Sequence, residues 1–312
     1  MAIYLVTGGA GFIGSHIAES LVDRGDEVRV LDNLLTGKRE NMAAFADRVR
    51  FIEGDIRDLE TCRRAVEGVD HVLHEAALPS VPRSVENPLL THEINVTGTL
   101  NLLVAARDAG ARSFVLASSS AVYGDESSPL KLEGKEGRPL SPYAIHKLVG
   151  EKYGEVFHDI FGLKTVALRY FNVFGPRQDP FSQYAAVIPL FITKVLQGES
   201  PVIYGDGEQS RDFIYVKNVA EANLMAAESG GAVRGESINI ACGERLTVNA
   251  LLAAVNEVLG TDIRPVYADP RPGDIKHSTA DVGKARRLMG YKPGVSFMDG
   301  LKETIAWYKK RS

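Results

Sequence analysis

Tyr143 and Lys147 are the two residues best suited to acid–base chemistry. Pro142 precedes them and marks the first turn of an expected helix, so the two side chains stand at positions i and i+4 on one face. A tyrosine has an ordinary pKa of about 10, but a neighbouring ammonium group favours its phenolate. This pair could take a proton from a sugar or alcohol hydroxyl, whereas a Tyr/Lys pair by itself is typical of a solvated helix surface.

A glycine-rich turn near the start of the chain indicates a site for a diphosphate. The apolar run of residues 2–6 predicts a buried strand, and apolar residues recur at helical spacing around and after Gly14. Such a turn leaves backbone N–H groups unpaired at the helix start, where the helix dipole also favours an anion. Gly8 permits the tight turn, Gly11 lets the backbone approach the phosphates, and Gly14 lets the helix pack on the strand.

Asp32 extends this turn into a dinucleotide-binding pattern. It ends a second apolar strand, residues 28–31, and lies 18 positions after Gly14 (32 − 14), near the roughly 20-residue spacing of a ribose-binding acid. A carboxylate there repels a 2′-phosphate, which favours NAD over NADP as the cofactor. The alternative is a strand-end turn residue, because Asn33 follows.

The remaining pattern predicts an α/β protein with a parallel sheet. Ligands of such sheets bind beyond the carboxyl ends of the strands. Asp55 and Ile56 come just after one expected strand and could flank an adenine ring, one by hydrogen bonding and one by packing. Ala76 and Ala77 follow another strand, and the serines at 118–120 follow a third. One helix is expected over about 90–109, in which Asn95 alone resembles a surface amide. The other expected strands are 49–53, 69–74, 113–117, 202–204, 213–216 and 237–241, and the other expected helices are 59–66, 187–196, 217–228, 248–259, 282–289 and 297–310.

Composition limits the classes of function. The 312 residues carry a formal net charge of −4, which gives no electrostatic footprint for nucleic acid. Cys62 and Cys242 form no C-x-x-C motif and suit a reducing compartment, and the seven histidines form no metal-ligand set. No apolar run approaches the roughly 20 residues of a membrane span, and the N-terminus enters a strand directly. We therefore expect a cytoplasmic protein that binds neither metal, nucleic acid nor membrane.

Together these motifs resemble the extended short-chain dehydrogenase/reductases, over essentially the full chain. The resemblance rests on residues 7–16, Asp32-Asn33, Gly54-Asp55, 118–120, Tyr143-x-x-x-Lys147, 169–177, 205–213 and 271–274. It implies a Rossmann-type doubly wound parallel sheet with a smaller mixed α/β substrate domain. The NAD-binding domain would comprise residues 1–170 with a returning segment at about 213–240. The nucleotide-sugar-binding domain would comprise residues 171–212 and 241–312.

The same resemblance implies roles for individual residues. The catalytic set would be Ser119, Tyr143 and Lys147, in which Ser119 relays or stabilises the proton. NAD would be held by Tyr143 and Lys147 together with Gly8, Gly11, Phe12, Ile13, Gly14, Asp32, Asn33, Asp55, Ile56, Ala76, Ala77, Asn95 and Tyr170. A UDP-sugar would be held by Ser119 and by Ser80, Ser120, Asn172, Val187, Tyr204, Arg211, Arg271, Asp274 and Ser278. The alternative for the C-terminal motifs is turns and surface charge.

The family includes nucleotide-sugar epimerases, dehydratases and decarboxylases, and the resemblance favours epimerisation. Dehydratases carry Thr-Asp-Glu where this chain has Ser119, Ser120 and Ala121, and decarboxylases of UDP-glucuronate typically keep a Glu at the last position. The match is closest to UDP-hexose 4-epimerases, with residues 78–84 and 183–189 most like the branch that acts on N-acetylated sugars. A UDP-glucuronate 4-epimerase, another nucleotide-sugar enzyme, a net dehydrogenase and an NAD-sensing module remain open.

Two further expectations come from the same resemblance. A homodimer is expected, in which the helix through Leu100 and the helix of Tyr143 form a four-helix bundle with their copies; alternatively both apolar faces cover their own sheet. Ser278 is expected to line the sugar pocket, where a small residue tolerates an N-acetyl group and a tyrosine does not. The alternative for Ser278 is a helix cap before the helix at 282–289.

Overall fold

The computed structural model describes residues 2–180, 186–270 and 276–311. Its main feature is a seven-stranded sheet of order β12-β7-β5-β4-β1-β2-β3, in which every neighbouring pair is parallel. The strand order reverses between β1 and β4, which is the switch point of a doubly wound fold. The strands are β1 (Ile3–Thr7), β2 (Glu27–Asp32), β3 (Val49–Glu53), β4 (His71–His74), β5 (Ser113–Ser119), β7 (Lys164–Tyr170) and β12 (Glu236–Ile240).

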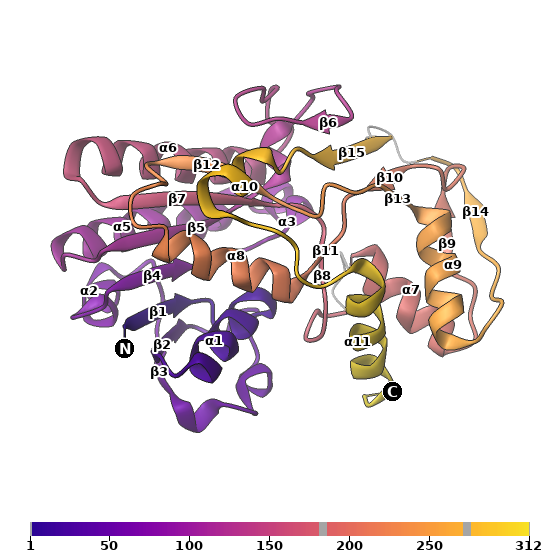
Figure 1. Cartoon of the computed structure of the whole chain (residues 1–312), viewed down its shortest axis with the longest axis horizontal. Helices are drawn as coiled ribbons and strands as arrows, with labels where there is room; N and C mark the ends of the chain where they lie inside the picture. Colours follow the sequence, from indigo (N-terminus) through magenta and orange to yellow (C-terminus); the bar gives the residue numbers. More distant parts are fainter. Residues whose placement is uncertain (1, 181–185, 271–275, 312) are drawn as a thin grey trace.

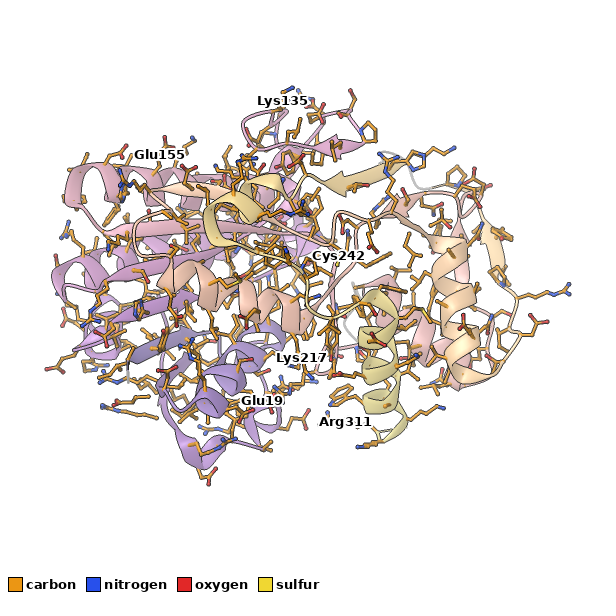
Figure 2. All side chains as sticks on the ribbon, in the orientation of Figure 1. Glu19, Lys135, Glu155, Lys217, Cys242 and Arg311 are labelled. Carbon is orange, nitrogen blue, oxygen red and sulfur yellow. The ribbon has the colours of Figure 1, made fainter. Side chains whose placement is uncertain are left out.

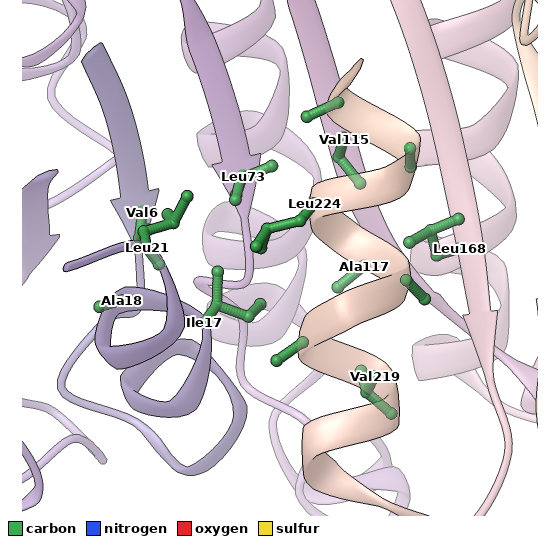
Figure 3. Close-up of a cluster of buried hydrophobic side chains, with 14 of the residues drawn as sticks. Val6, Ile17, Ala18, Leu21, Leu73, Val115, Ala117, Leu168, Val219 and Leu224 are labelled. Atoms are coloured by element: carbon green, nitrogen blue, oxygen red, sulfur yellow. The ribbon is translucent and has the colours of Figure 1, made fainter. Parts of the chain in front are cut away.

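Helices cover both faces of this sheet (Figure 1). On one face, α1 (Phe12–Arg24) and α8 (Val216–Glu228) bury apolar side chains against the strands; Figure 3 shows Leu224 of α8 directed toward Leu73 of β4. On the other face pack α2 (Leu59–Val66), α5 (Gly98–Asp108) and α6 (Pro142–Phe161). Both faces of the sheet are therefore largely excluded from water, which agrees with the buried apolar residues, such as Val6, Leu73 and Val115, that its strands contribute to the two cores.

A smaller mixed α/β part lies beyond the carboxyl ends of the strands of the large sheet (Figure 1). Its core joins α7 (Val187–Leu196), α9 (Val248–Leu259) and α11 (Phe297–Lys309). Its strands are short: β13 (Leu246–Thr247), β10 (Ser210–Arg211), β15 (His277–Ala280) and β6 (Leu130–Lys131) form one sheet, and β14 (Val266–Ala268) pairs with β9 (Val202–Tyr204). β8 (Val173–Phe174) and β11 (Ile214–Tyr215) form a separate parallel pair. In the sequence, both strands lie between β7 and β12 of the large sheet.

The expected α/β architecture with a Rossmann-type sheet is confirmed. The domain boundaries stay a prediction. The helix α10 (Gly283–Met289) bears on them, because Ala285 and the following Tyr291 are buried in the core between the large sheet, α1 and α8. This packing favours assigning residues 283–291 to the NAD-binding domain as a second returning segment.

A helical segment covers the range expected at 90–109, but it begins at Pro88, ends at Asp108 and is not regular throughout. The chain forms α3 (Val81–Glu86), α4 (Pro88–His92), a π-helical turn at Glu93–Thr97 and then α5. Ser80 and Asn87 cap the two short helices, and Pro82 and Pro88 stand in their first turns. The buried residues of the π-helical turn are Ile94, Asn95 and Val96.

Candidate active site

A cleft of about 1520 Å³ lies beyond the carboxyl ends of the large sheet, between it and the smaller part of the molecule. One wall consists of residues at or just after the strand ends, such as Gly8, Asp32, Glu75 and Ser119. The opposite wall includes Thr193 of α7 and Trp307 of α11. The cleft therefore occupies the crevice in which doubly wound sheets bind their ligands.

The glycine turn forms a cradle that side chains would fill. Gly8 has φ +67°, and a Cβ there would lie 2.7 Å from the backbone nitrogen of Ala76. A Cβ on Gly14 would lie 2.3 Å from the carbonyl oxygen of Gly8. Gly11 is the N-cap of α1 and offers no side-chain oxygen to the first-turn N–H groups. These donors face the cleft at the positive end of a helix and fit the diphosphate of a dinucleotide.

Asp32 stands beside this cradle at the end of β2. Its carboxylate accepts hydrogen bonds from the backbone nitrogens of Ala10 at 3.0 Å and Leu34 at 2.8 Å. Burial raises its pKa, and the two backbone hydrogen bonds oppose that rise. Each carboxylate oxygen has a second lone pair available, so Asp32 fits the ribose hydroxyls of NAD.

Asn33 and Asp55 extend the same wall. The Asn33 amide donates to Asp55 at 2.8 Å, and the Arg57 guanidinium forms an ion pair with Asp55 at 2.8 Å. Hydrogen bonds from Arg57 hold the pKa of the Asp55 carboxyl at about 2. These contacts fix the Asp55 side chain next to Ile56. We expect the adenine of a bound NAD at this end of the cleft.

Ser119, Tyr143 and Lys147 meet in the middle of the cleft. Ser141 caps α6 by accepting a hydrogen bond from Ala144, which starts the helix at Pro142 as expected. Lys147 donates from Nζ to the carbonyl of Ala117 at 2.7 Å, and Nζ lies 5.9 Å from the centre of the Tyr143 ring. The Ser119 side chain lies close enough to Tyr143 to lower the pKa of its phenol.

The expectation that Lys147 lowers the pKa of Tyr143 is not met in the protein alone. Burial raises the pKa of Tyr143; the Ser119 side chain lowers it, and the charge of Glu75 raises it further. Burial also lowers the pKa of Lys147 to about 8, which disfavours its positively charged form. The negative charges of Glu75 and Glu151 oppose this decrease. The sequence spacing placed the two side chains correctly but could not reveal how little water reaches them.

Glu75 is a polar residue of the cleft that sequence reasoning missed. It follows β4 directly, and its carboxylate accepts a hydrogen bond from the Tyr170 hydroxyl at 2.6 Å. The Asn223 amide of α8 donates to the same Tyr170 hydroxyl at 2.8 Å. Burial raises the pKa of Glu75 to about 7, while Tyr170 and Lys147 oppose that rise.

Two other residues hold the cleft wall in place. The buried amide of Asn95 bonds both backbone groups of Leu78, at 2.7 Å to the nitrogen and 3.2 Å to the oxygen. Ser84 of α3 accepts a hydrogen bond from the Tyr143 backbone nitrogen at 3.1 Å. Asn95 is therefore neither a surface amide nor part of the cleft lining, although its expected contact with NAD stays a prediction.

Most of the expected cofactor and substrate residues share this one cleft. Besides the catalytic three, the lining includes Gly8, Gly11, Phe12, Ile13, Gly14, Asp32, Asn33, Asp55, Ile56, Ala76, Ala77, Ser80, Ser120, Tyr170 and Asn172. Asn172 donates to the Asp212 carbonyl at 3.0 Å.

Four expected substrate residues lie outside the cleft lining. Val187 begins α7 and packs on the core of the smaller part. Tyr204 lines a separate hollow of about 710 Å³ with Tyr267 and Lys276. Arg211 and Ser278 are direct neighbours on β10 and β15, so both side chains are on the same face of that sheet. Arg271 and Asp274, with residues 183–185, lie outside the described residues.

The alternative that Ser278 caps a helix is wrong. Ser278 lies within β15, whereas α10 begins at Gly283 with Val282 as its N-cap. Within the described residues no group of three or more His, Cys, Asp or Glu side chains is placed to hold a metal ion. None of the helices in the described segments is long and apolar enough to cross a membrane.

Residues 4–241 match the model of the NAD dependent epimerase/dehydratase family, and the chain belongs to that family. This agrees with the cradle around Gly8 and with Asp32, and it confirms NAD as the cofactor.

The similar proteins narrow the class to nucleotide-sugar 4-epimerases, as the resemblance implied. A protein of Methanocaldococcus jannaschii named putative UDP-glucose 4-epimerase is 41% identical over 310 residues, with 99% of each chain covered. The UDP-N-acetylglucosamine 4-epimerase of Methanobrevibacter ruminantium, solved with UDP-N-acetylmuramic acid, is 46% identical with a TM-score of 0.93 over 100% of this chain and 99% of that one. The UDP-glucose 4-epimerase of Thermus thermophilus, solved with NAD, is 41% identical with a TM-score of 0.87 over 100% of both chains.

Proposed function

We propose that this chain epimerises a UDP-hexose at carbon 4 through a transient 4-keto sugar, with UDP-GlcNAc and UDP-GalNAc as preferred substrates. The observation that carries the proposal is the meeting of Ser119, Tyr143 and Lys147 with the glycine cradle and Asp32 in one cleft. The relatives and solved structures named as UDP-hexose 4-epimerases support the same reaction.

Tyr143 would serve as the acid–base group. Its phenolate would take the proton from the carbon-4 hydroxyl, and the phenol so formed would later return it. Ser119, whose side chain acts on the pKa of Tyr143, would share that proton by hydrogen bonding. Lys147, held by the Ala117 carbonyl, places a positive charge beside the Tyr143 ring. NAD, when bound, accepts a hydride from carbon 4 and gives it back, so it is regenerated in each cycle.

The burial of the site explains why these roles belong to the loaded protein. In the protein alone burial holds Tyr143 in its protonated form. A cationic ligand beside the phenol would stabilise the phenolate by direct charge attraction, and the effect is strong where water is excluded. Gly8, Gly14 and Asp32 fit the diphosphate and ribose of such a ligand and would fix its position relative to Tyr143.

The side chains around Ser119 support epimerisation over elimination. Elimination of a hydroxyl needs an acid and a base in contact with the sugar ring. Dehydratases are expected to carry acids at the two positions that are Ser120 and Ala121 in this chain, and neither of these side chains is an acid. A keto sugar formed here would therefore have return of the hydride as its available route.

The preference for N-acetylated sugars is supported by Ser278. It is small, it pairs with Arg211 in register, and Arg211 is the expected ligand of the diphosphate. A pocket wall built from serine leaves room for a bulky substituent at carbon 2 when the sugar turns over. The 46% identical structure named as a UDP-N-acetylglucosamine 4-epimerase supports the same preference.

Replacement of Tyr143 by phenylalanine tests the reaction. We expect Tyr143→Phe to retain bound NAD and thermal stability but to lose turnover by about two orders of magnitude or more, the usual scale of positioned acid–base catalysis. Tyr153→Phe is the matched control, because Tyr153 lies on the same helix, outside the cleft lining, and packs on the core. Epimer formation followed by NMR gives the rates. A Tyr143→Phe variant with a rate near that of the unmodified protein would remove Tyr143 from the mechanism.

A further inference from the structure

Glu75 is a carboxyl group in the cleft to which the proposed reaction assigns no role. Its backbone nitrogen donates to the Thr7 carbonyl at 3.2 Å, which ties the strand end of β4 to that of β1. Its side chain is half-buried and lines the cleft. Removing a carboxylate from water costs free energy, and carboxyl groups kept in such a setting often belong to functional sites.

The Glu75 carboxylate is held in place from two other elements. Tyr170 of β7 donates to it at 2.6 Å, and Asn223 of α8 donates to the Tyr170 hydroxyl at 2.8 Å. Asn223 is fully buried and is fixed by a second bond to the Val219 carbonyl at 2.9 Å. Tyr170, itself held by Asn223, thus orients the carboxylate through one hydrogen bond to Oε1, and no ion pair to Glu75 is found among the residues that the structure describes.

The charges that face Glu75 come from α6. Lys147 lowers the pKa of Glu75, and Glu75 in turn raises the pKa values of Lys147 and Tyr143. The second carboxylate near Lys147 is Glu151, but Glu151 is occupied by an ion pair with Arg169 at 2.7 Å.

His74, next to Glu75 in the chain, carries no competing charge. Burial lowers the pKa of His74 to about 3, and its ring bonds the hydroxyls of Thr7 and Thr99. Tyr170 also stays neutral, because burial and the charge of Glu75 raise its pKa well above the usual range. Glu75 is thus the carboxylate on the cleft wall whose charge is left to act on Lys147 and Tyr143.

We propose that Glu75 is a positioning residue whose carboxylate balances the charge of Lys147 and holds Tyr143 in its protonated form. The proposal rests on the acid–base role proposed for Tyr143. Glu75 favours the ammonium form of Lys147 because the charges are opposite, and it disfavours the phenolate of Tyr143 because the charges are alike. Glu75 would therefore keep a proton on Tyr143 ready for return to the sugar and set the pH range in which the protein works.

The sign of the effect follows from removal of one negative charge. In Glu75→Gln the phenolate of Tyr143 loses a repulsion, so the acidic limb of the pH profile of kcat/KM should move to lower pH by about one unit, the scale of one nearby charge. The ammonium of Lys147 loses an attraction, so the alkaline limb should also move to lower pH. Glu75→Asp keeps the charge and should leave both limbs nearly in place.

The experiment compares pH profiles of kcat/KM for the unmodified protein, Glu75→Gln, Glu75→Asp and a control, Glu155→Gln. Glu155 lies exposed on the outer part of α6, where it pairs with Lys152 at 2.8 Å (Figure 2). Its replacement removes the same charge from the helix that carries Tyr143 and Lys147, but at a site in contact with water, and should shift neither limb. An unshifted acidic limb in Glu75→Gln, or an equal shift in Glu155→Gln, would overturn the proposal.

A second readout does not depend on turnover. The absorbance of tyrosinate during a pH titration reports Tyr143 directly, as the difference between each protein and its Tyr143→Phe counterpart. We expect this pKa to fall in Glu75→Gln, and an unchanged value would contradict the proposal even in an inactive variant. If Glu75→Gln does not fold, Tyr170→Phe removes the hydrogen bond that favours the carboxylate; it should shift the acidic limb in the same direction by less, and no shift would count against the proposal.

The two proposals fail in different ways. If Tyr143→Phe remains active, the proposed acid–base role of Tyr143 is wrong. If Tyr143→Phe is inactive and Glu75→Gln shifts neither the pH profile nor the tyrosinate titration, only the role of Glu75 is wrong.

Discussion

At the scale of the residue, the cleft depends on how far each polar group is removed from water. Burial raises the pKa values of Tyr143 and Glu75 and lowers that of Lys147, so each of the three groups favours its uncharged form. In such a place each charge is controlled by its few neighbours, because water screens little. The chemistry of Tyr143 is therefore a property of the group Ser119, Lys147 and Glu75 together with the ligand.

Sequence spacing identified Ser119, Tyr143, Lys147 and Asp32, because each stands at a fixed distance from a turn, a helix start or a strand end. It did not identify Glu75 and Asn223 as members of the site. Residues 75, 170 and 223 come from β4, β7 and α8, and only the folded sheet brings them together. The one signal available was a charged residue directly after a buried strand, at the edge where ligands bind.

Ser278 carries a prediction at this scale. We expect the unmodified protein to epimerise UDP-GlcNAc and UDP-GalNAc, and Ser278→Tyr to reduce those rates far more than the rates with UDP-glucose and UDP-galactose. The reason is steric, because a tyrosine beside Arg211 would occupy space needed by the N-acetyl group. Rates with the four substrates, measured for both proteins, give the comparison, and Ser278→Ala, which adds no bulk, is the control. A parallel loss with all four substrates would show that Ser278 does not select the sugar.

At the scale of the element, the segment 81–109 shows what periodicity cannot predict. The helix expected there is interrupted by a π-helical turn, and the turn directs Asn95 inward, where its amide fixes Leu78. The Gly98 that follows has no side chain because a Cβ would lie 2.5 Å from Ile56. Caps and strand ends were predictable from local residue types, whereas this irregular turn depends on contacts with Leu78 and Ile56, which are distant in the sequence.

The helix α6 presents a second face that its own sheet leaves uncovered. Phe157 is buried and Tyr153 packs on the core, so those two side chains face their own sheet as the alternative held. Ile145, Val156, Ile160 and Phe161 are nonetheless exposed, with Ile160 at 68% exposed. An apolar face of this kind on one long helix is typical of a surface that packs against another protein.

We predict that this face closes a homodimer, with α6 of each copy at the centre. Sedimentation at micromolar concentration should give twice the mass of the chain, and Ile160→Lys should give the monomer because it places a charge in the apolar contact. Lys164→Glu, an exposed change at the start of β7, controls for a general effect of altered charge. A monomer for the unmodified protein would show that the exposed residues of α6 serve no self-association.

At the scale of the whole molecule, the large sheet and the smaller part form one cleft, and the two walls of this cleft have different roles. The strand ends of the large sheet carry Ser119 and the groups that fit NAD, and α6 carries Tyr143 and Lys147. The smaller part brings Asn172, α7 and α11 to the other side. The Rossmann-type sheet was predictable because its strands are continuous apolar runs followed by small or polar residues. Several short strands of the smaller part, such as β10 and β15, have only two to four residues and were not predictable from any pattern.

This arrangement makes the fate of the hydride the central question. If the cleft holds NAD and the sugar together through the whole cycle, the hydrogen removed from carbon 4 must return to the same carbon. A net dehydrogenase would instead release a keto sugar and leave the cofactor reduced, and a protein that only senses NAD would leave the sugar unchanged.

The most direct measurement offers the purified protein UDP-GlcNAc labelled with deuterium at carbon 4, without added cofactor, and follows the products by NMR. We predict formation of UDP-GalNAc that retains the deuterium at carbon 4, with no build-up of reduced nicotinamide. The account would be contradicted by unchanged substrate both here and with UDP-glucose, by loss of the label to solvent, or by a keto sugar formed in step with reduced cofactor.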